Sequence, residues 1–133
     1  MKQKIAAEHR ELDLLVAEVR ALLRRNDSAA GDALADLRVA LESHFEREEG
    51  PYYPVIWSLR PERKPALMRF IRAHEHFRAN MGEVATQLAA GSAAEAGRVL
   101  ELFAEQFTLH EREEEAVLRS LDRELASAPS GGA

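Results

Sequence analysis

The amino-acid sequence predicts an all-α fold, an up-down-up-down four-helix bundle with a metal site in its core. Three observations lead to this prediction. Apolar residues recur at intervals of three and four along four long segments, which is the spacing of amphipathic helices. Short stretches of turn-forming residues separate these segments, as in bundles of antiparallel helices. Histidine and glutamate also stand on the apolar stripes at corresponding places in the two halves of the chain.

The composition suits one domain and excludes several classes of protein. A chain of 133 residues, 46% hydrophobic and 31% charged, is expected to form one soluble globular domain. It has no cysteine, so disulfides and thiolate metal sites are excluded, and a cytoplasmic location is expected. A net charge of −5 disfavours nucleic acid as a partner. We also expect no membrane span and no secretory signal, because no apolar stretch is long enough.

The first two helices form one predicted hairpin. The stripe of the first, over residues 5–23, consists of Ile5, His9, Leu12, Val16, Val19 and Leu23. Residues 26–28 (Asn-Asp-Ser) then provide turn and N-cap chemistry. The stripe of the second helix consists of Leu34, Leu37, Leu41, His44 and Glu48. We expect this helix to end at Gly50-Pro51, because proline does not fit a helix interior.

The second hairpin follows a connector, residues 50–65, that holds four of the five prolines. The stripe of the third helix consists of Leu67, Phe70, Ile71, His74, Phe77, Met81, Val84 and Leu88, and Gly91 ends it. Ser92, with Glu95 three residues later, predicts a capping box at the start of the fourth helix. Its stripe consists of Phe103, Phe107, His110, Glu114, Val117, Leu121 and Leu125. The domain is therefore expected over residues 1–126, followed by a disordered tail, residues 127–133.

The two hairpins repeat the same polar residues. His9 and His74 are 65 residues apart, and His44 and His110 are 66 apart, as are Glu48 and Glu114. With a rise of about 1.5 Å per residue along each helix, all four histidines are expected at a similar height in a bundle of antiparallel helices. Each glutamate lies one turn beyond a histidine on the same face. Six side chains are therefore expected to converge inside the bundle.

Such a cluster predicts a metal site. A single histidine on an apolar stripe is more often an ordinary core residue, and a single glutamate in a charged run is usually exposed. Together, however, four imidazoles and two carboxylates suit iron, manganese, zinc or cobalt, whereas calcium prefers oxygen ligands alone. Six ligands suit a pair of metal ions, with both glutamates bridging and two histidines on each ion. A bridging oxide or hydroxide, or a further carboxylate, would balance the charge.

Other residues near the cluster have weaker candidate roles. Asp13, one turn after His9, is a candidate further carboxylate, with an ordinary surface position as the alternative. Tyr52, four residues after Glu48, is a candidate to cap the site with its hydroxyl, with packing in the core or a loop as the alternative. His76 points away from the stripe and is expected on the surface. Solvated positions are also expected for Glu49, Glu111, Glu113 and Glu115.

These motifs resemble those of the hemerythrin-like, HHE cation-binding family. The resemblance rests on His9, His74, two H-x-x-x-E motifs and the strings EHREL, HFEREEGPYYP and HEREEEAVL, and it covers residues 1 to 126. It implies a non-haem centre of two iron ions, oxo- or hydroxo-bridged, in a four-helix bundle; manganese or zinc would also fit the ligands. It further implies the metal ligands His9, His44, Glu48, His74, His110 and Glu114.

The ligand pattern differs from that of oxygen-carrying hemerythrins, which have a fifth histidine four residues after the one on helix three. Arg78 stands there in this chain. The pattern is closer to four-His, two-Glu members, which resemble bacterial iron-centre repair proteins of nitrosative stress. The cysteine-containing domain of those proteins is not part of this sequence.

From these observations we expect a di-iron protein that binds or reacts with O2, NO or peroxide, in sensing, scavenging or iron handling as part of a stress response. One alternative is a bundle with a structural metal such as zinc, whose surface binds a protein partner. The other is a helical interaction module without a metal. The sequence leaves open whether the protein is an enzyme, which metal is native and what its oligomeric state is.

Overall fold

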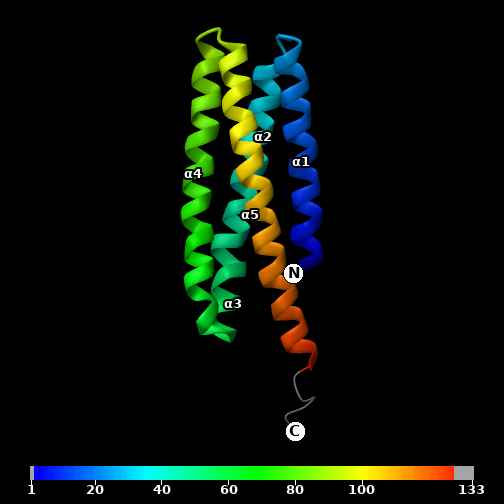
Figure 1. The fold of residues 1–133 in the computed structure, drawn as a ribbon, viewed down its shortest axis with the longest axis vertical. Helices are drawn as coiled ribbons and strands as arrows, with labels where there is room; N and C mark the ends of the chain where they lie inside the picture. Colours follow the sequence, from blue (N-terminus) through cyan, green and yellow to red (C-terminus); the bar gives the residue numbers. More distant parts are fainter. Residues whose placement is uncertain (1, 128–133) are drawn as a thin grey trace.

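Four long helices lie side by side in an elongated bundle in the computed structural model, which describes residues 2–127 (Figure 1). The helices are α1 (Lys2–Arg24), α2 (Ala30–Arg47), α4 (Lys64–Ala89) and α5 (Ala93–Ser127). No strand occurs among the described residues. The predicted four-helix bundle is therefore confirmed. Ser127, assigned above to the tail, still belongs to α5, and the rest of that expected tail, 128–133, lies outside the described residues.

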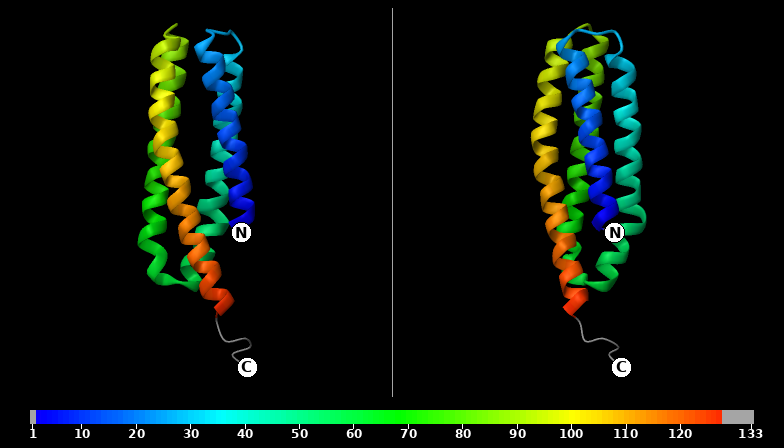
Figure 2. Two further views of the ribbon diagram at one scale, coloured as in Figure 1. Left: turned by 45° about the vertical axis from the view of Figure 1, so that its right-hand side comes forward. Right: turned by 90° about the vertical axis from the view of Figure 1, so that its right-hand side faces the viewer.

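Two tight turns at one end of the bundle connect α1 to α2 and α4 to α5 (Figure 2). In the first turn, Asp27 Oδ1 accepts a hydrogen bond of 2.8 Å from the backbone N–H of Ala29. In the second, Gly91 has a φ of +81°, a conformation that suits glycine and ends α4. The expected capping box is not the arrangement found after this turn, because Glu95 forms an ion pair with Arg98.

The connection from α2 to α4 corrects the prediction that the second helix stops at Gly50-Pro51. The chain continues through one wide π-helical turn, η1 (Glu48–Tyr52), into α3 (Tyr53–Leu59) and then a 3₁₀ turn, η2 (Pro61–Arg63). Pro51 lies inside η1, where it has no N–H to donate. The wider turn accommodates the proline within the helical segment. The backbone N–H of Tyr53 donates to the carbonyl of Glu48, five residues earlier.

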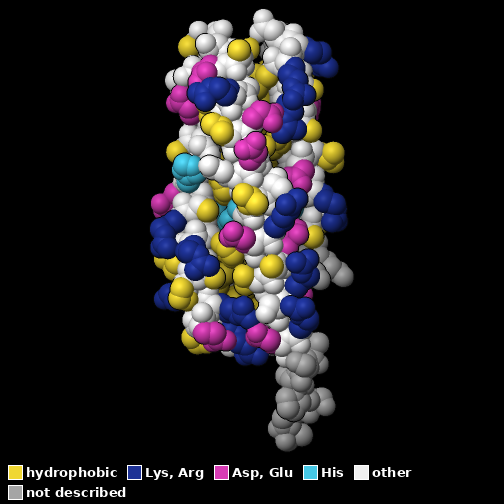
Figure 3. Space-filling view, in the orientation of Figure 1, with side chains coloured by type: hydrophobic (Ala, Val, Ile, Leu, Met, Phe, Trp, Pro, Cys, Tyr) yellow, Lys and Arg dark blue, Asp and Glu magenta, His cyan; other side chains and the backbone are white. Residues whose placement is uncertain are grey.

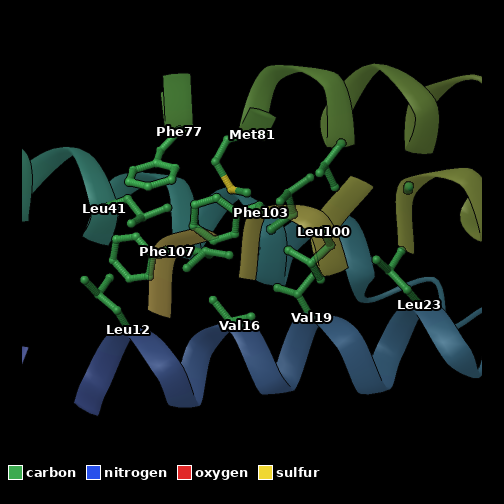
Figure 4. Packing of buried hydrophobic residues seen from close by; sticks show 14 of the residues in the cluster. Leu12, Val16, Val19, Leu23, Leu41, Phe77, Met81, Leu100, Phe103 and Phe107 are labelled. Atoms are coloured by element: carbon green, nitrogen blue, oxygen red, sulfur yellow. The ribbon is translucent and has the colours of Figure 1, made fainter. Parts of the chain in front are cut away.

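The hydrophobic core has two parts. The larger lies toward the two tight turns, where Leu12, Val16, Val19 and Leu23 of α1 face Phe103 and Phe107 of α5 (Figure 4). The smaller lies toward the α3 end and consists of Ile5, Tyr53, Ile56, Leu67, Phe70, Leu118 and Leu121. On α1, α4 and α5 the predicted histidine falls between a residue of one part and a residue of the other, so a polar layer is enclosed between two apolar ones.

The outside of the bundle carries charges of both signs. Figure 3 shows lysine or arginine interspersed with aspartate or glutamate along the face that it presents. Among the described residues, no helix is both long enough and apolar enough to cross a membrane.

Candidate metal centre

The six predicted ligand residues all lie inside the bundle, in the polar layer. Each of the four long helices contributes a histidine, while Glu114 comes from α5 and Glu48 begins η1. The exposed fractions are 3% for His9, 1% for His44, 0% for Glu48, 0% for His74, 6% for His110 and 1% for Glu114. The predicted convergence of these side chains is thus found in the structure.

The six residues form two overlapping groups of potential ligand atoms. One group is His9, His44, Glu48 and Glu114, and the other is Glu48, His74, His110 and Glu114. Within each group, one ligand atom per residue lies within 4.8 Å of all the others. Both glutamates belong to both groups, which is the arrangement expected of two carboxylates between two cations.

The imidazole Nε2 atoms and the carboxylate oxygens face one another at the centre. Glu48 Oε1 lies 3.1 Å from His44 Nε2 and 3.3 Å from His74 Nε2. Glu114 Oε1 lies 3.0 Å from His9 Nε2, and its Oε2 lies 3.9 Å from His110 Nε2. Glu114 thus directs one oxygen toward His9 and the other toward His110.

Several of these inner atoms have no hydrogen-bond partner. Both oxygens of Glu48, Oε1 of Glu114 and Nε2 of His9 are buried and unpartnered. A buried carboxylate without a donor or cation costs several kcal/mol, on the order of 3–5 when a partner is missing. Imidazole nitrogen and carboxylate oxygen together form a donor set that iron, manganese, cobalt and zinc accept. The residues present therefore fit bound metal ions.

Burial controls the protonation of these groups. It lowers the pKa of His74 to about 3 and that of His110 to about 4, so both rings are neutral at pH 7 and able to bind a metal. Burial and the charge of Glu114 raise the pKa of Glu48 well above its usual range. Burial opposes ionisation of Glu114 as well, but the neighbouring Glu48, His9, His110 and Tyr53 lower its pKa. The two carboxyls titrate as a coupled pair, in which the pKa of Glu48 is raised and that of Glu114 is lowered.

A family model, the hemerythrin HHE cation-binding domain, matches residues 2–121 of this chain. The chain belongs to the hemerythrin HHE cation-binding domain family. A metal cofactor follows from this membership, and the buried histidine and glutamate cluster fits it. Comparisons with curated proteins and with solved structures gave no significant match.

Three carboxylates outside the cluster orient the histidines of this hemerythrin-like domain. The Nδ1 atom of His44 contacts Glu8 Oε2 at 2.6 Å, and that of His74 contacts Glu49 Oε2 at 2.8 Å. Likewise, His9 Nδ1 lies 3.0 Å from Glu115 Oε1. In each contact the carboxylate accepts a hydrogen bond from Nδ1–H, so Nε2 faces the centre of the cluster. Such outer partners fix ring orientation and raise the basicity of metal-binding histidines.

These contacts correct the expectation that Glu49, Glu111 and Glu115 are simply solvated. Glu49 and Glu115 are half-buried, and Glu111 is only 6% exposed, with its Oε2 3.7 Å from His9 Nδ1. Burial raises the pKa of Glu111 to about 9. Glu113 is exposed, as expected.

Glu8 was not singled out from the sequence, although a signal exists. Glu8, Glu49 and Glu115 each follow or precede an inner ligand directly in the chain. A neighbouring position is turned by about 100° around the helix and therefore faces the adjacent helix. A glutamate there reaches Nδ1 of the histidine on that helix. We call Nδ1 the outer nitrogen, because Nε2 faces the centre of the cluster.

A tyrosine does contact the cluster, but it is Tyr53 and not Tyr52. The hydroxyl of Tyr53 donates to Glu114 Oε2 and lies 3.5 Å from His74 Nε2. Burial raises the pKa of Tyr53 well above its usual range, so the hydroxyl keeps its proton. Tyr52 is half-buried and packs against the smaller part of the core. The wide turn at Pro51 explains the difference, because it brings the fifth residue after Glu48, rather than the fourth, to the inner face.

The other candidate positions lie outside the cluster. Asp13 is exposed and is an electrostatic neighbour of Glu111 rather than a member of the cluster. His76 is exposed, as expected. The side chain of Arg78 turns toward carboxylates, with Nε 2.8 Å from Glu42 Oε2 and Nη2 3.0 Å from Glu49 Oε2.

Aromatic rings close the cluster on its larger core side. Phe45 stacks on the ring of His74, with centroids 4.0 Å apart and planes 13° apart. Phe77 meets His110 edge to face at 5.3 Å, and Phe70 meets the same ring at 5.3 Å from the opposite part of the core. This packing keeps bulk water from the histidines and holds their rings in place.

Proposed function

We propose that the protein holds two iron ions in this cluster and that the pair binds or reacts with O2, NO or peroxide. In this proposal His9 and His44 bind one ion, His74 and His110 bind the other, and Glu48 and Glu114 bridge them. The role would be sensing, scavenging or iron handling in a stress response. The absence of cysteine favours a reducing, cytoplasmic setting.

One observation carries this proposal: Glu48 is fully buried among imidazole nitrogens, with neither oxygen partnered. A carboxylate that served only the fold would accept hydrogen bonds from donors of the chain. Glu48 instead approaches a histidine of each pair with the same oxygen. This supports a bridging role and a site for two cations rather than one.

The residues of the chain prepare the site for small ligands. Burial holds the imidazoles of His74 and His110 neutral, and outer glutamates direct the Nε2 atoms of His44 and His74 inward. Phenylalanine rings exclude water, and Tyr53 holds a proton at its hydroxyl beside Glu114. When bound, an iron pair supplies open coordination positions and a shared two-electron redox change.

Metal analysis and the optical spectrum of protein produced with iron test this proposal. We expect close to two irons per chain and near-ultraviolet bands that bleach on reduction and return in air. The variant His44→Ala should lose these bands, whereas His76→Ala, which changes an exposed histidine, should keep them. Zinc alone would favour a structural metal and a surface that binds a protein partner. A chain that binds no metal would contradict the proposal outright.

A further inference from the structure

The two halves of the cluster have the same inner ligand types but different surroundings. We call them the His9–His44 half and the His74–His110 half. Three carboxylates stand around the outer nitrogens of the first half, namely Glu8, Glu111 and Glu115. In the second half, Glu49 is the only described residue whose carboxylate contacts an outer nitrogen, and Arg78 binds the same Glu49 oxygen. The outer nitrogens of the His9–His44 half therefore have more carboxyl neighbours than those of the other half, although Arg47 pairs with Glu8.

A hydroxyl group reaches only the second half. Tyr53 is 1% exposed, and its hydroxyl lies 3.5 Å from His74 Nε2 while it donates to Glu114 Oε2. That oxygen is the one directed to His110, since Oε1 is directed to His9. Within the described part of the chain, no hydroxyl contacts the Nε2 atom of His9 or His44. The Tyr53 hydroxyl thus stands in the space where a ligand of the second half would lie.

The same hydrogen bond makes the two bridging candidates unequal. Both oxygens of Glu48 are unpartnered, whereas Glu114 has one unpartnered oxygen and one engaged by Tyr53. An oxygen that already accepts a proton donor has less electron density to give to a cation. Glu114 should therefore bind more weakly on the His74–His110 side, which leaves a position there for a ligand from outside.

Access from solvent also differs between the halves. A groove between α4 and α5 has His110 in its wall. Its other lining residues are the apolar Phe70, Ala73, Phe77 and Leu109 and the polar Arg69, His76, Gln106 and Glu113. The grooves beside the first half carry several charged side chains, namely Glu8, Glu11, Asp36, Arg47, Arg10, Asp13, Glu111, Arg112 and Glu115. An uncharged diatomic molecule favours the α4–α5 groove, which has fewer charged side chains, because apolar surface solvates it better than charged surface.

We propose that small ligands bind at the His74–His110 half and that Tyr53 donates a hydrogen bond to the bound ligand. The inference rests on the proposed pair of metal ions and assigns the ligand position to one side of it. Tyr53 is then the residue that distinguishes two otherwise matching halves. In the absence of a ligand its hydroxyl donates a hydrogen bond to Glu114 Oε2, and on binding the hydroxyl turns to the new acceptor.

Azide binding to the iron-loaded protein tests the role of Tyr53. Azide is a small anion whose complex with ferric iron absorbs visible light, so its Kd can be measured by titration. The variant Tyr53→Phe should keep two irons per chain and the helical content, but its azide Kd should rise about tenfold to a hundredfold, the usual effect of losing a hydrogen bond to a charged group. The control Tyr52→Phe removes a hydroxyl outside the cluster and should leave the Kd unchanged.

The possible results separate this inference from the proposed function. Two irons with an unchanged azide Kd in Tyr53→Phe would overturn the inference and leave the metal pair intact. Fewer than two metals in the wild-type protein would overturn both. A crystal structure of the wild-type azide complex provides a second, variant-free measurement. It should place an azide nitrogen about 3 Å from the Tyr53 hydroxyl, and azide on the His9–His44 half would refute the assignment.

Discussion

Glu8 holds the outer nitrogen of His44 at 2.6 Å, while the inner nitrogen of the same ring faces Glu48 at 3.1 Å. One histidine thus links a carboxylate near the surface of α1 to the centre of the bundle. The guanidinium of Arg47 also binds Glu8, with Nε 2.7 Å from Oε1, and so fixes the position of the carboxylate. The contact predicts that residues outside the cluster control its affinity for metal.

The variant Glu8→Ala should bind metal about 10 to 100 times more weakly, because His44 loses the acceptor that orients its ring. Competition with a chromophoric chelator, using Co²⁺ or Zn²⁺, measures this change. Glu11→Ala is the matched control, since Glu11 is an exposed residue of the same helix that lines the same groove. Equal affinities for both variants and wild type would show that the Glu8 contact has no part in metal binding.

The variant Glu48→Leu should stabilise the metal-free protein while it abolishes binding of a second metal ion. Glu48 is fully buried with both oxygens unpartnered, and such groups cost stability that an apolar side chain recovers. We expect a gain on the order of 1–3 kcal/mol in urea unfolding of chelator-treated protein. Glu46→Leu, at an exposed position of α2, should give no such gain. A less stable metal-free Glu48→Leu would mean that this carboxyl supports the fold.

The metal-free protein should become less stable as the pH rises from about 6.5 to 9. Burial opposes protonation of His9, but Glu114 and Glu115 outweigh it and raise the pKa to about 9. Burial raises the pKa of Glu111 to about 9 and that of Glu48 well above its usual range. In this window the folded chain binds more protons than the unfolded chain at His9 and Glu111, so stability is lost at about 1.4 kcal/mol per pH unit for each proton.

Urea unfolding of chelator-treated protein across this pH range measures that loss. The variant Glu111→Gln should reduce the slope by about one proton, because the amide does not titrate. Glu113→Gln, an exposed neighbour, should leave the slope as it is. Stability that increases with pH over the same range would contradict the assigned proton uptake.

Phe45→Ala should destabilise the fold by about 3–5 kcal/mol, the usual cost of truncating a buried phenylalanine. Phe45 is 1% exposed and stacks on His74, so the loss should also weaken metal binding. Unfolding in urea measures the first effect and chelator competition the second. Leu14→Ala, at a side chain that is 73% exposed, should change stability by less than about 0.5 kcal/mol. A small effect of Phe45→Ala would mean that His74 needs no aromatic support.

The inner cluster could be predicted from sequence because two regular patterns agree. Helical periodicity places His9, His44, His74 and His110 on the inward stripes, and the repeat between hairpins places them at one height. Regular helices preserve both relationships over many residues, so errors in the exact helix ends did not matter. Glu48 and Glu114 followed from their distance of one turn from a histidine.

Tyr53 could not be predicted in the same way, because it lies beyond an irregular turn. Counting one regular turn from Glu48 leads to Tyr52, and the π-helical turn at Pro51 moves the inward position by one residue. A proline in a helical segment signals a disturbance, but the sequence does not say whether the chain stops, kinks or widens there. The structure shows a widened turn that continues directly into α3.

The outer glutamates were missed for a different reason. Glu8, Glu49 and Glu115 stand in charged runs that look the same as an ordinary solvated helix face. Their function depends on which helix lies next to them, and this neighbour relationship is a property of the packed bundle. Charge patterns within a single helix do not contain it.

Anomalous diffraction from a crystal of the iron-loaded protein, measured at the iron absorption edge, tests the central proposal most directly. We expect two anomalous peaks per chain in the polar layer, one against the Nε2 atoms of His9 and His44 and one against those of His74 and His110. Glu48 and Glu114 should contact both peaks. A single peak, or iron bound elsewhere on the chain, would contradict the proposal of a carboxylate-bridged pair.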